Sequence, residues 1–169
     1  DYTLVLKGHI QLALAKFPEN TTGYKLDILA RNPLRKYGKD YKHGTGHGVG
    51  DVLSVHEGPQ NIGLRYTDAP MKAGMITSNE PGFYCAGSHG IRIESLTLTK
   101  EWKTTEYGTF LEFETLTLCP IDTRPVVKEL LLPEELTWLN DYNQAVRTAL
   151  EPHLDDVHRS FLKERTQAL

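Results

Sequence analysis

The chain has 169 residues, and its composition excludes several classes of protein. Hydrophobic residues make up 39% and charged residues 24%, which is typical of a globular domain and excludes wholesale disorder. No apolar run is long enough to span a membrane, and the net charge of −3 argues against nucleic acid as the main partner. Two cysteines form neither a disulfide framework nor a C-x-x-C zinc site. Because the start of the chain has no signal-peptide pattern, we expect a cytoplasmic protein.

The N-terminal third is predicted to be helical. An apolar stripe over residues 4–17 predicts a first helix that stops at Pro18. We expect a second helix to begin at a cap formed by Thr21 or Thr22. Pro33 should lie in or near an irregularity of that helix, because proline has no backbone N–H to donate.

The composition changes at residues 43–50, which hold four glycines and two histidines. That glycine content argues against a regular helix. Alternating and β-branched patterns then predict strands over residues 52–56, 74–79, 91–99 and 110–118. We expect the last two strands to pair as a hairpin with a turn near residues 101–103. Beyond residue 133 the pattern becomes helical again, with a break at Pro152. The order of helices, strands and helices predicts an α+β fold.

Three side chains are candidates for chemistry. His47 lies among glycines, which remove bulk and suit close approach of a metal or substrate. Glu80 lies at a predicted turn and Glu94 in an alternating strand, and each alone is typical of a solvated carboxylate. Arg92 shares a strand face with Glu94 and could simply form an ion pair with it. One imidazole with two carboxylates suits manganese, cobalt or zinc, although this wide spacing is not specific for a metal site.

Four motifs occur in an order that resembles the catalytic domain of aminopeptidase P, a Xaa-Pro aminopeptidase of the pita-bread family. They are His43-Gly-Thr-Gly-His47-Gly-Val-Gly, Val55-His56-Glu57-Gly58-Pro59, Asn79-Glu80-Pro81-Gly82 and Gly90-Ile91-Arg92-Ile93-Glu94. The resemblance extends over residues 5–10, 113–121 and 138–142, so it covers nearly the whole chain. It implies the C-terminal half of a pita-bread domain over residues 1–121, with helices packed on a curved, mainly antiparallel sheet. Residues 122–169 would form a helical C-terminal extension.

The resemblance also implies a metal centre. His47, Glu80 and Glu94 match three ligands of a dinuclear site, usually occupied by manganese, with zinc or cobalt as alternatives. Glu94 matches a carboxylate that bridges the two metals. The family site takes two further aspartates from upstream strands, and Asp1 runs into a helix instead of a strand. This chain is therefore expected to bind at most one metal ion, weakly.

Catalytic roles follow from the same resemblance. Glu80 matches the general base that acts on metal-bound water. His56 and His43 match histidines that contact the substrate near the scissile bond and the proline. Arg92 matches a residue that orients the carboxylates, which its fork of donors suits.

The resemblance leaves three functions open. The first is a fragment of a metal-dependent enzyme that hydrolyses the bond between an N-terminal residue and a following proline. Its substrates would be peptides with proline at the second position, and the 169-residue chain alone would be inactive. The second is a non-catalytic pita-bread module that binds proteins, and the third is a related metallopeptidase such as prolidase. We expect the parent protein to be a homodimer that uses the helices over residues 133–162, with no nucleic-acid or membrane partner.

Overall fold

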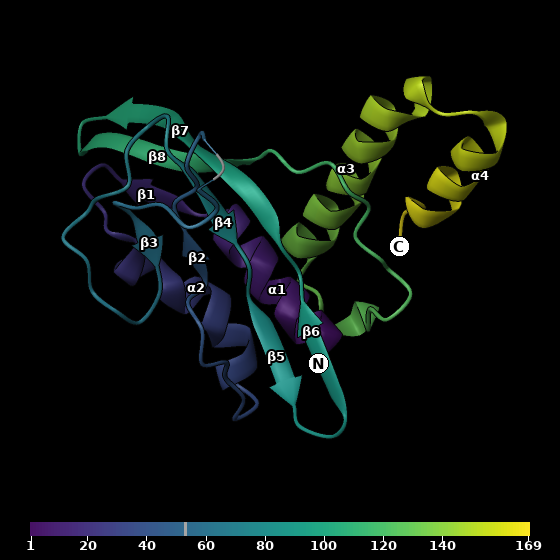
Figure 1. Ribbon diagram of the computed structural model, residues 1–169, viewed down its shortest axis with the longest axis horizontal. Coiled ribbons are helices and arrows are strands. Elements are labelled where there is room, and N and C mark those ends of the chain that lie inside the picture. Colours follow the sequence, from purple (N-terminus) through teal and green to yellow (C-terminus); the bar gives the residue numbers. More distant parts are fainter. Residues whose placement is uncertain (53) are drawn as a thin grey trace. The chain divides into compact units, whose positions relative to one another are not determined.

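The computed structural model describes residues 1–52 and 54–169. Helices come first along the chain, strands follow, and helices end it (Figure 1), so the α+β prediction is confirmed. The chain divides into two compact units: residues 1 and 3–116 form the first, and residues 2 and 117–169 form the second. The predicted domain boundary after residue 121 stays a prediction. None of the helices in the described ranges combines the length and the apolar character needed to cross a bilayer.

The first helix is shorter than predicted. Helix α1 spans Tyr2–Ala13, and Phe17 lies instead on strand β1, Lys16–Pro18. The apolar stripe continues past the helix because Phe17 packs against Phe113, with ring centroids 5.1 Å apart. Phe17 continues the helical spacing of α1 but lies on β1, because the helix and the strand face the same core.

Helix α2 spans Gly23–Arg35, and Thr22 lies at its N-cap position, but the Thr22 side chain makes no capping hydrogen bond, so the predicted threonine cap is not formed. The Thr21 hydroxyl does not cap the helix but donates to the carbonyl of Pro18 at 2.7 Å. Pro33 lies inside α2, and beyond it the Tyr37 N–H donates to the carbonyl of Leu34 in a tighter turn. The irregularity expected at this proline is therefore confined to the end of the helix.

The main sheet has four antiparallel strands in the order β1-β8-β7-β4. Strand β4 spans Ile76–Asn79, β7 spans Ser95–Thr105 and β8 spans Gly108–Thr115. The β7–β8 hairpin is confirmed, but the predicted turn at residues 101–103 is wrong. The chain stays extended there with a shift in register and reverses only at residues 106–107, before a glycine with φ +109°.

Two short ribbons accompany the main sheet. Strand β2, Gly46–His47, pairs with β3, Asn61–Ile62, and β5, Gly82–Cys85, pairs with β6, His89–Arg92. The strand predicted over residues 52–56 is not formed by its described residues, and Leu53 lies outside them. Next to this segment, the Gly50 N–H donates to the carbonyl of Ser54, and the Glu57 N–H donates to the carbonyl of Gly48.

The core of the first unit lies between the two N-terminal helices and the sheet. Its buried cluster draws on α1, α2, β1, β3 and β8, and consists of Leu12, Ala15, Phe17, Leu26, Ala30, Ile62, Met71, Leu111 and Phe113. Burying each large apolar side chain contributes about 1.5–3 kcal/mol. This cluster fixes the two helices against β1, β3 and β8, and β3 in turn pairs with β2, which carries His47.

The second unit consists of a leading segment and the C-terminal helices. Helix α3 spans Pro133–Leu150 and α4 spans Asp156–Arg165, with one-turn helices at Lys128–Leu130 and Glu151–His153. The helical pattern and its break near Pro152 are thus confirmed. Inside this unit, the amide of Asn143 both donates to and accepts from the backbone of Ile121, at 3.1 and 3.0 Å. This pair ties α3 to the segment that precedes it.

His9, on α1, is an ionisable residue that is completely buried. Burial lowers the pKa of His9 to about 4, although backbone groups of Ile93 and Asn79 that face the ring favour its charged form. The side-chain amide of Asn79 also donates to the carbonyl of His9 at 2.9 Å. His9 therefore lies beneath the ends of β4 and β6 as a neutral imidazole at physiological pH.

We predict that His9 makes the stability of this chain fall in mild acid. Its pKa is about 4 in the folded state and about 6.5 in the unfolded state, so between these values the unfolded chain binds the extra proton. The free energy of unfolding should then fall as the pH drops from about 6.5 to 4, by roughly 3 kcal/mol in total. Urea denaturation across this range should show a shallower fall for His9→Gln than for the unaltered chain. Equal slopes would contradict the assignment.

Candidate active site

Glu80 is the centre of the candidate site. It directly follows β4 and is only 7% exposed, so its interpretation as a solvated turn carboxylate is wrong. One carboxylate oxygen, Oε1, lies 3.0 Å from Nε2 of His47 and accepts a hydrogen bond from Oγ of Ser78 at 2.9 Å. The other, Oε2, lies 3.3 Å from Nη1 of Arg92. Three side chains from different parts of the sequence thus fix both oxygens.

The glycine-rich segment brings His47 to Glu80 by packing backbone against backbone. A Cβ atom at Gly46 would lie 1.9 Å from the carbonyl oxygen of Ser78, so only glycine fits there. The Glu80 N–H donates to the carbonyl of Thr45 at 2.8 Å, and the His47 N–H donates to Oγ of Ser78 at 3.0 Å. The close approach expected at these glycines is therefore made by the backbone of β4.

The ring of His47 is oriented so that it suits a cation. Its Nδ1 lies 3.0 Å from the carbonyl oxygen of Gly48, which only accepts, so Nδ1 carries the proton. In a neutral ring, the lone pair of Nε2 then faces the Glu80 carboxylate. A cation between these two groups would accept both as ligands. Two ligands bonded to one metal at about 2.1 Å lie roughly 3 Å apart when the bonds meet at a right angle. The residues therefore fit a divalent ion.

Glu94 lies opposite Glu80 in the strand register. The β4–β7 and β5–β6 ladders share one continuous register on either side of a two-residue gap. Carried across the gap, it sets Glu80 opposite Glu94 and Pro81 opposite Ile93, whose N–H reaches the carbonyl of Pro81 at 3.4 Å. Directly opposed side chains share a face, and like charges there repel. Glu94 is solvent-exposed, so a cation could relieve this repulsion.

The described residues alone nevertheless do not complete a metal site. Among the described residues, no group of three or more histidine, cysteine, aspartate or glutamate side chains is placed to hold a metal ion. Glu80 and His47 form the one close pair of the predicted ligand set, and Glu94 joins them through the register alone. Additional anionic ligands are needed to complete a metal centre.

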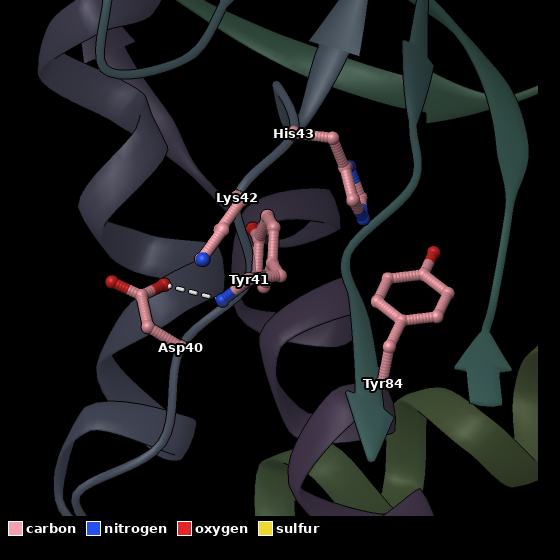
Figure 2. Close-up of a pocket in the computed structure, with 5 residues that line it drawn as sticks. All are labelled: Asp40, Tyr41, Lys42, His43 and Tyr84. Atoms are coloured by element: carbon pink, nitrogen blue, oxygen red, sulfur yellow. Dashed lines mark hydrogen bonds between the residues drawn. The ribbon is translucent and has the colours of Figure 1, made fainter. Parts of the chain in front are cut away.

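The two flanking histidines lie at different parts of this site. His56 is exposed, and the centroid of its ring lies 4.2 Å from that of His47. His43 is 5.4 Å from the ring of Tyr84 and lines a pocket of about 520 Å³ (Figure 2). Its Nε2 is buried and has no hydrogen-bond partner among the described residues. The hydroxyl of Tyr84 accepts from Nε of Arg92 at 2.9 Å, so the His43 pocket connects to Glu80 through Arg92.

Sequence reasoning missed two residues of this arrangement, Ser78 and Tyr84. Both differ from Glu80 by an even number of positions, and residues with this spacing lie on one face of an extended chain. That period-2 relation was the available signal. The ion pair suggested between Arg92 and Glu94 is replaced by one between Arg92 and Glu80.

Two family profiles match the chain. The profile of metallopeptidase family M24 matches residues 1–101, and that of the C-terminal region of peptidase M24 matches residues 109–169. The chain belongs to metallopeptidase family M24. Its α+β architecture is the pita-bread fold of these peptidases, as the sequence predicted.

Relatives within this family are similar along almost the whole chain. Aminopeptidase P1 of Lotus japonicus is 46% identical over 98% of the chain, and a probable Xaa-Pro aminopeptidase P of Coprinopsis cinerea is 48% identical over 98%. The crystal structure of X-prolyl aminopeptidase from Caenorhabditis elegans, described as a cytosolic enzyme with a di-nuclear active site, is 45% identical, with a TM-score of 0.91 over 99% of the chain. The chain spans 26–28% of the length of these relatives.

Prolidase is also similar, but over less of the chain. The structure of prolidase from Pyrococcus furiosus is 31% identical and covers 66% of the chain, with a TM-score of 0.54. Prolidase and X-prolyl aminopeptidase therefore share the general fold of this chain. The prolidase structure covers 66% of the chain, whereas the X-prolyl aminopeptidase structure covers 99%.

We predict that Gly46→Ala displaces β2 from β4 and disrupts the His47–Glu80 contact. Overpacking of this kind costs typically 1–3 kcal/mol, and we expect a loss of at least about 2 kcal/mol because the clash is with backbone. Thermal or urea denaturation measures it. Gly44→Ala is the matched control in the same segment, because its Cβ would meet nothing nearer than 3.5 Å. Similar losses for both variants would contradict the close-approach argument.

Proposed function

We propose that the complete protein carrying this chain is a metal-dependent Xaa-Pro aminopeptidase. It would hydrolyse the bond between an N-terminal residue and a following proline. The observation that carries this proposal is the His47–Glu80 pair, held by Ser78 and Arg92 and opposed by Glu94. The similarity of nearly the whole chain to relatives named aminopeptidase P supports the same reaction.

His47, Glu80 and Glu94 are the proposed metal ligands. When bound, two divalent ions polarise a carbonyl and lower the pKa of water. The donor set of one imidazole and two carboxylates favours manganese, with zinc or cobalt as alternatives. Two cations a few ångströms apart repel, so several anionic ligands must offset their charge. The described residues supply too few, and this chain alone would therefore hold at most one ion weakly.

Glu80 is proposed as the general base. Because Ser78 and Arg92 each hold one carboxylate oxygen, the carboxylate is fixed in orientation before a proton reaches it. Arg92 would orient the carboxylates. His56, beside His47, and His43, which lines the pocket, are proposed to contact the peptide near the scissile bond and the proline.

The Caenorhabditis elegans relative is described as cytosolic, which supports a cytoplasmic location for this protein. We propose that the complete protein forms a homodimer through residues 133–162 and acts on peptides whose second residue is proline. Neither nucleic acid nor a membrane is proposed as a partner.

Two other functions have less support. Prolidase activity is disfavoured because the Pyrococcus furiosus enzyme matches 66% of the chain, whereas the X-prolyl aminopeptidase structure matches 99%. A non-catalytic binding module would not need His47, Glu80, Glu94, His43 and His56 together. Hydrolysis of dipeptides alone would favour prolidase, and peptide binding without hydrolysis would favour the module.

We predict turnover by the complete protein and little or none by the 169-residue chain. The assay measures release of the N-terminal residue from a peptide with proline at position two, with manganese added to each protein. Glu80→Gln should reduce turnover by the complete protein at least about 100-fold, because removing a general base costs about 10²–10⁴-fold. His47→Ala should also reduce turnover strongly, because it removes a proposed metal ligand.

Arg35→Lys is the control for these two variants, since Arg35 is an exposed partner of Asp40 away from Glu80. Unchanged turnover by the Glu80 variant would remove the proposed base. Turnover by the short chain would contradict the proposed need for further ligands.

A further inference from the structure

Arg31, on α2, is fully buried at 0% exposure, which is rare for arginine unless its charge is paired. Its guanidinium makes four hydrogen bonds. Nε donates to Asp27 at 2.6 Å, and Nη1 donates to Asp40 at 2.8 Å. Nη1 also donates to the carbonyl of Tyr41 at 2.6 Å, and Nη2 to the carbonyl of His43 at 2.7 Å. The planar fork therefore joins two carboxylates and two backbone carbonyls.

The two carbonyls belong to a segment that has no regular structure of its own. Residues 39–45 form neither helix nor strand, so their buried carbonyls must find partners elsewhere. Arg31 donates hydrogen bonds to two of these carbonyls. It also lies over the ring of Tyr41, with Cζ 4.0 Å from the ring centroid. It thus fixes both the backbone and a side chain of this segment.

Asp27 holds the other end of the same segment. Its Oδ1 accepts a hydrogen bond from the hydroxyl of Thr45, which also contacts the Tyr41 hydroxyl at 2.6 Å. The carbonyl of Thr45 in turn accepts from the N–H of Glu80 at 2.8 Å. The Asp27–Arg31 pair, one helical turn apart, therefore reaches the backbone of His43 on one side and of Glu80 on the other.

The segment controlled in this way carries the imidazole of His43 to the pocket. Figure 2 shows the ring of His43 between those of Tyr41 and Tyr84, with ring centroids 4.7 and 5.4 Å away and an edge-on arrangement against Tyr84. His43 Nδ1 is occupied by the carbonyl of Gly44 at 2.7 Å, while Nε2 has no partner among the described residues. Because Tyr41 and Gly44, two of the three described residues that contact this ring, belong to the same segment, a shift of its backbone would move Nε2.

We propose that Asp27 and Arg31 are positioning residues, which hold residues 41–45 so that His43 faces the substrate pocket and Thr45 anchors Glu80. Neither side chain lines the pocket, so both act through others. The proposal rests on the proposed aminopeptidase function only for its kinetic readout. Its physical basis is that a misplacement of about 1 Å can cost about 10²-fold in rate.

The kinetic test is a double-mutant cycle in the complete protein. Arg31→Lys keeps the charge, but an ammonium cannot reproduce the planar fork. With manganese and a peptide carrying proline at position two, it should lower kcat/KM about 10–100-fold, with the larger part in KM. His43→Ala combined with Arg31→Lys should be little worse than His43→Ala alone, because both changes remove the same contact. Fully additive losses, or unchanged kinetics in Arg31→Lys, would overturn the proposal.

Arg35→Lys is the matched control, because Arg35 lies one turn further along α2 and pairs with the same Asp40 at 2.9 Å. Its side chain is 39% exposed, against 1% for Arg31, and kcat/KM should change less than about twofold. If Arg31→Lys does not fold by circular dichroism, Asp27→Asn replaces it in the cycle. That variant keeps the shape and an oxygen for Thr45.

A second readout does not depend on peptide turnover. In ¹⁵N-histidine spectra of the metal-free complete protein, the His43 ring signals should move in Arg31→Lys and stay in place in Arg35→Lys. If the unaltered protein fails to hydrolyse the peptide while the His43 signals behave as expected, the proposed function fails and the positioning role stands. Unmoved His43 signals in Arg31→Lys would overturn the positioning role whatever the activity.

Discussion

The candidate site depends on the close approach of the glycine-rich backbone to strand β4. Gly46 lies against the carbonyl of Ser78 at a distance that excludes any side chain. Because of this contact, His47 and Glu80, 33 positions apart in sequence, bring Nε2 and Oε1 within 3.0 Å. The same contact lets Thr45 accept a hydrogen bond from the Glu80 backbone. The site is therefore built on main-chain geometry, and its side chains add chemistry to a frame that the backbone has fixed.

Electrostatics then determines what this frame favours. Nε2 of His47 faces a buried carboxylate, and the register sets a second carboxylate opposite the first. Both features favour positive charge between the groups. Arg92 offsets part of the charge of Glu80 from one side. Among the described residues no third ligand completes a metal site around this pair, so the remaining negative charge favours a cation held by additional ligands.

Buried charge also organises the approach to the site. Removing one partner of a buried ion pair typically costs about 3–5 kcal/mol, so the pair between Asp27 and Arg31 needs its full set of hydrogen bonds. That set includes the carbonyls of an irregular segment, and the bonds therefore give this segment one conformation. His43 belongs to this segment, so the same hydrogen bonds constrain the position of its backbone. A structural ion pair on a helix and a side chain at a pocket are thereby linked through a few main-chain atoms.

The sequence by itself determined the α+β order, the two N-terminal helices, the long hairpin and the family motifs, because periodicity and glycine content act over short ranges. It also singled out His43, His47, Glu80 and Arg92. Only the tertiary structure decided that Phe17 joins the sheet, that Arg92 pairs with Glu80, and that Ser78 and Tyr84 belong to the arrangement. These outcomes depend on contacts between residues distant in sequence, or across a strand register. A local pattern specifies which face a residue occupies but not which partner meets it there.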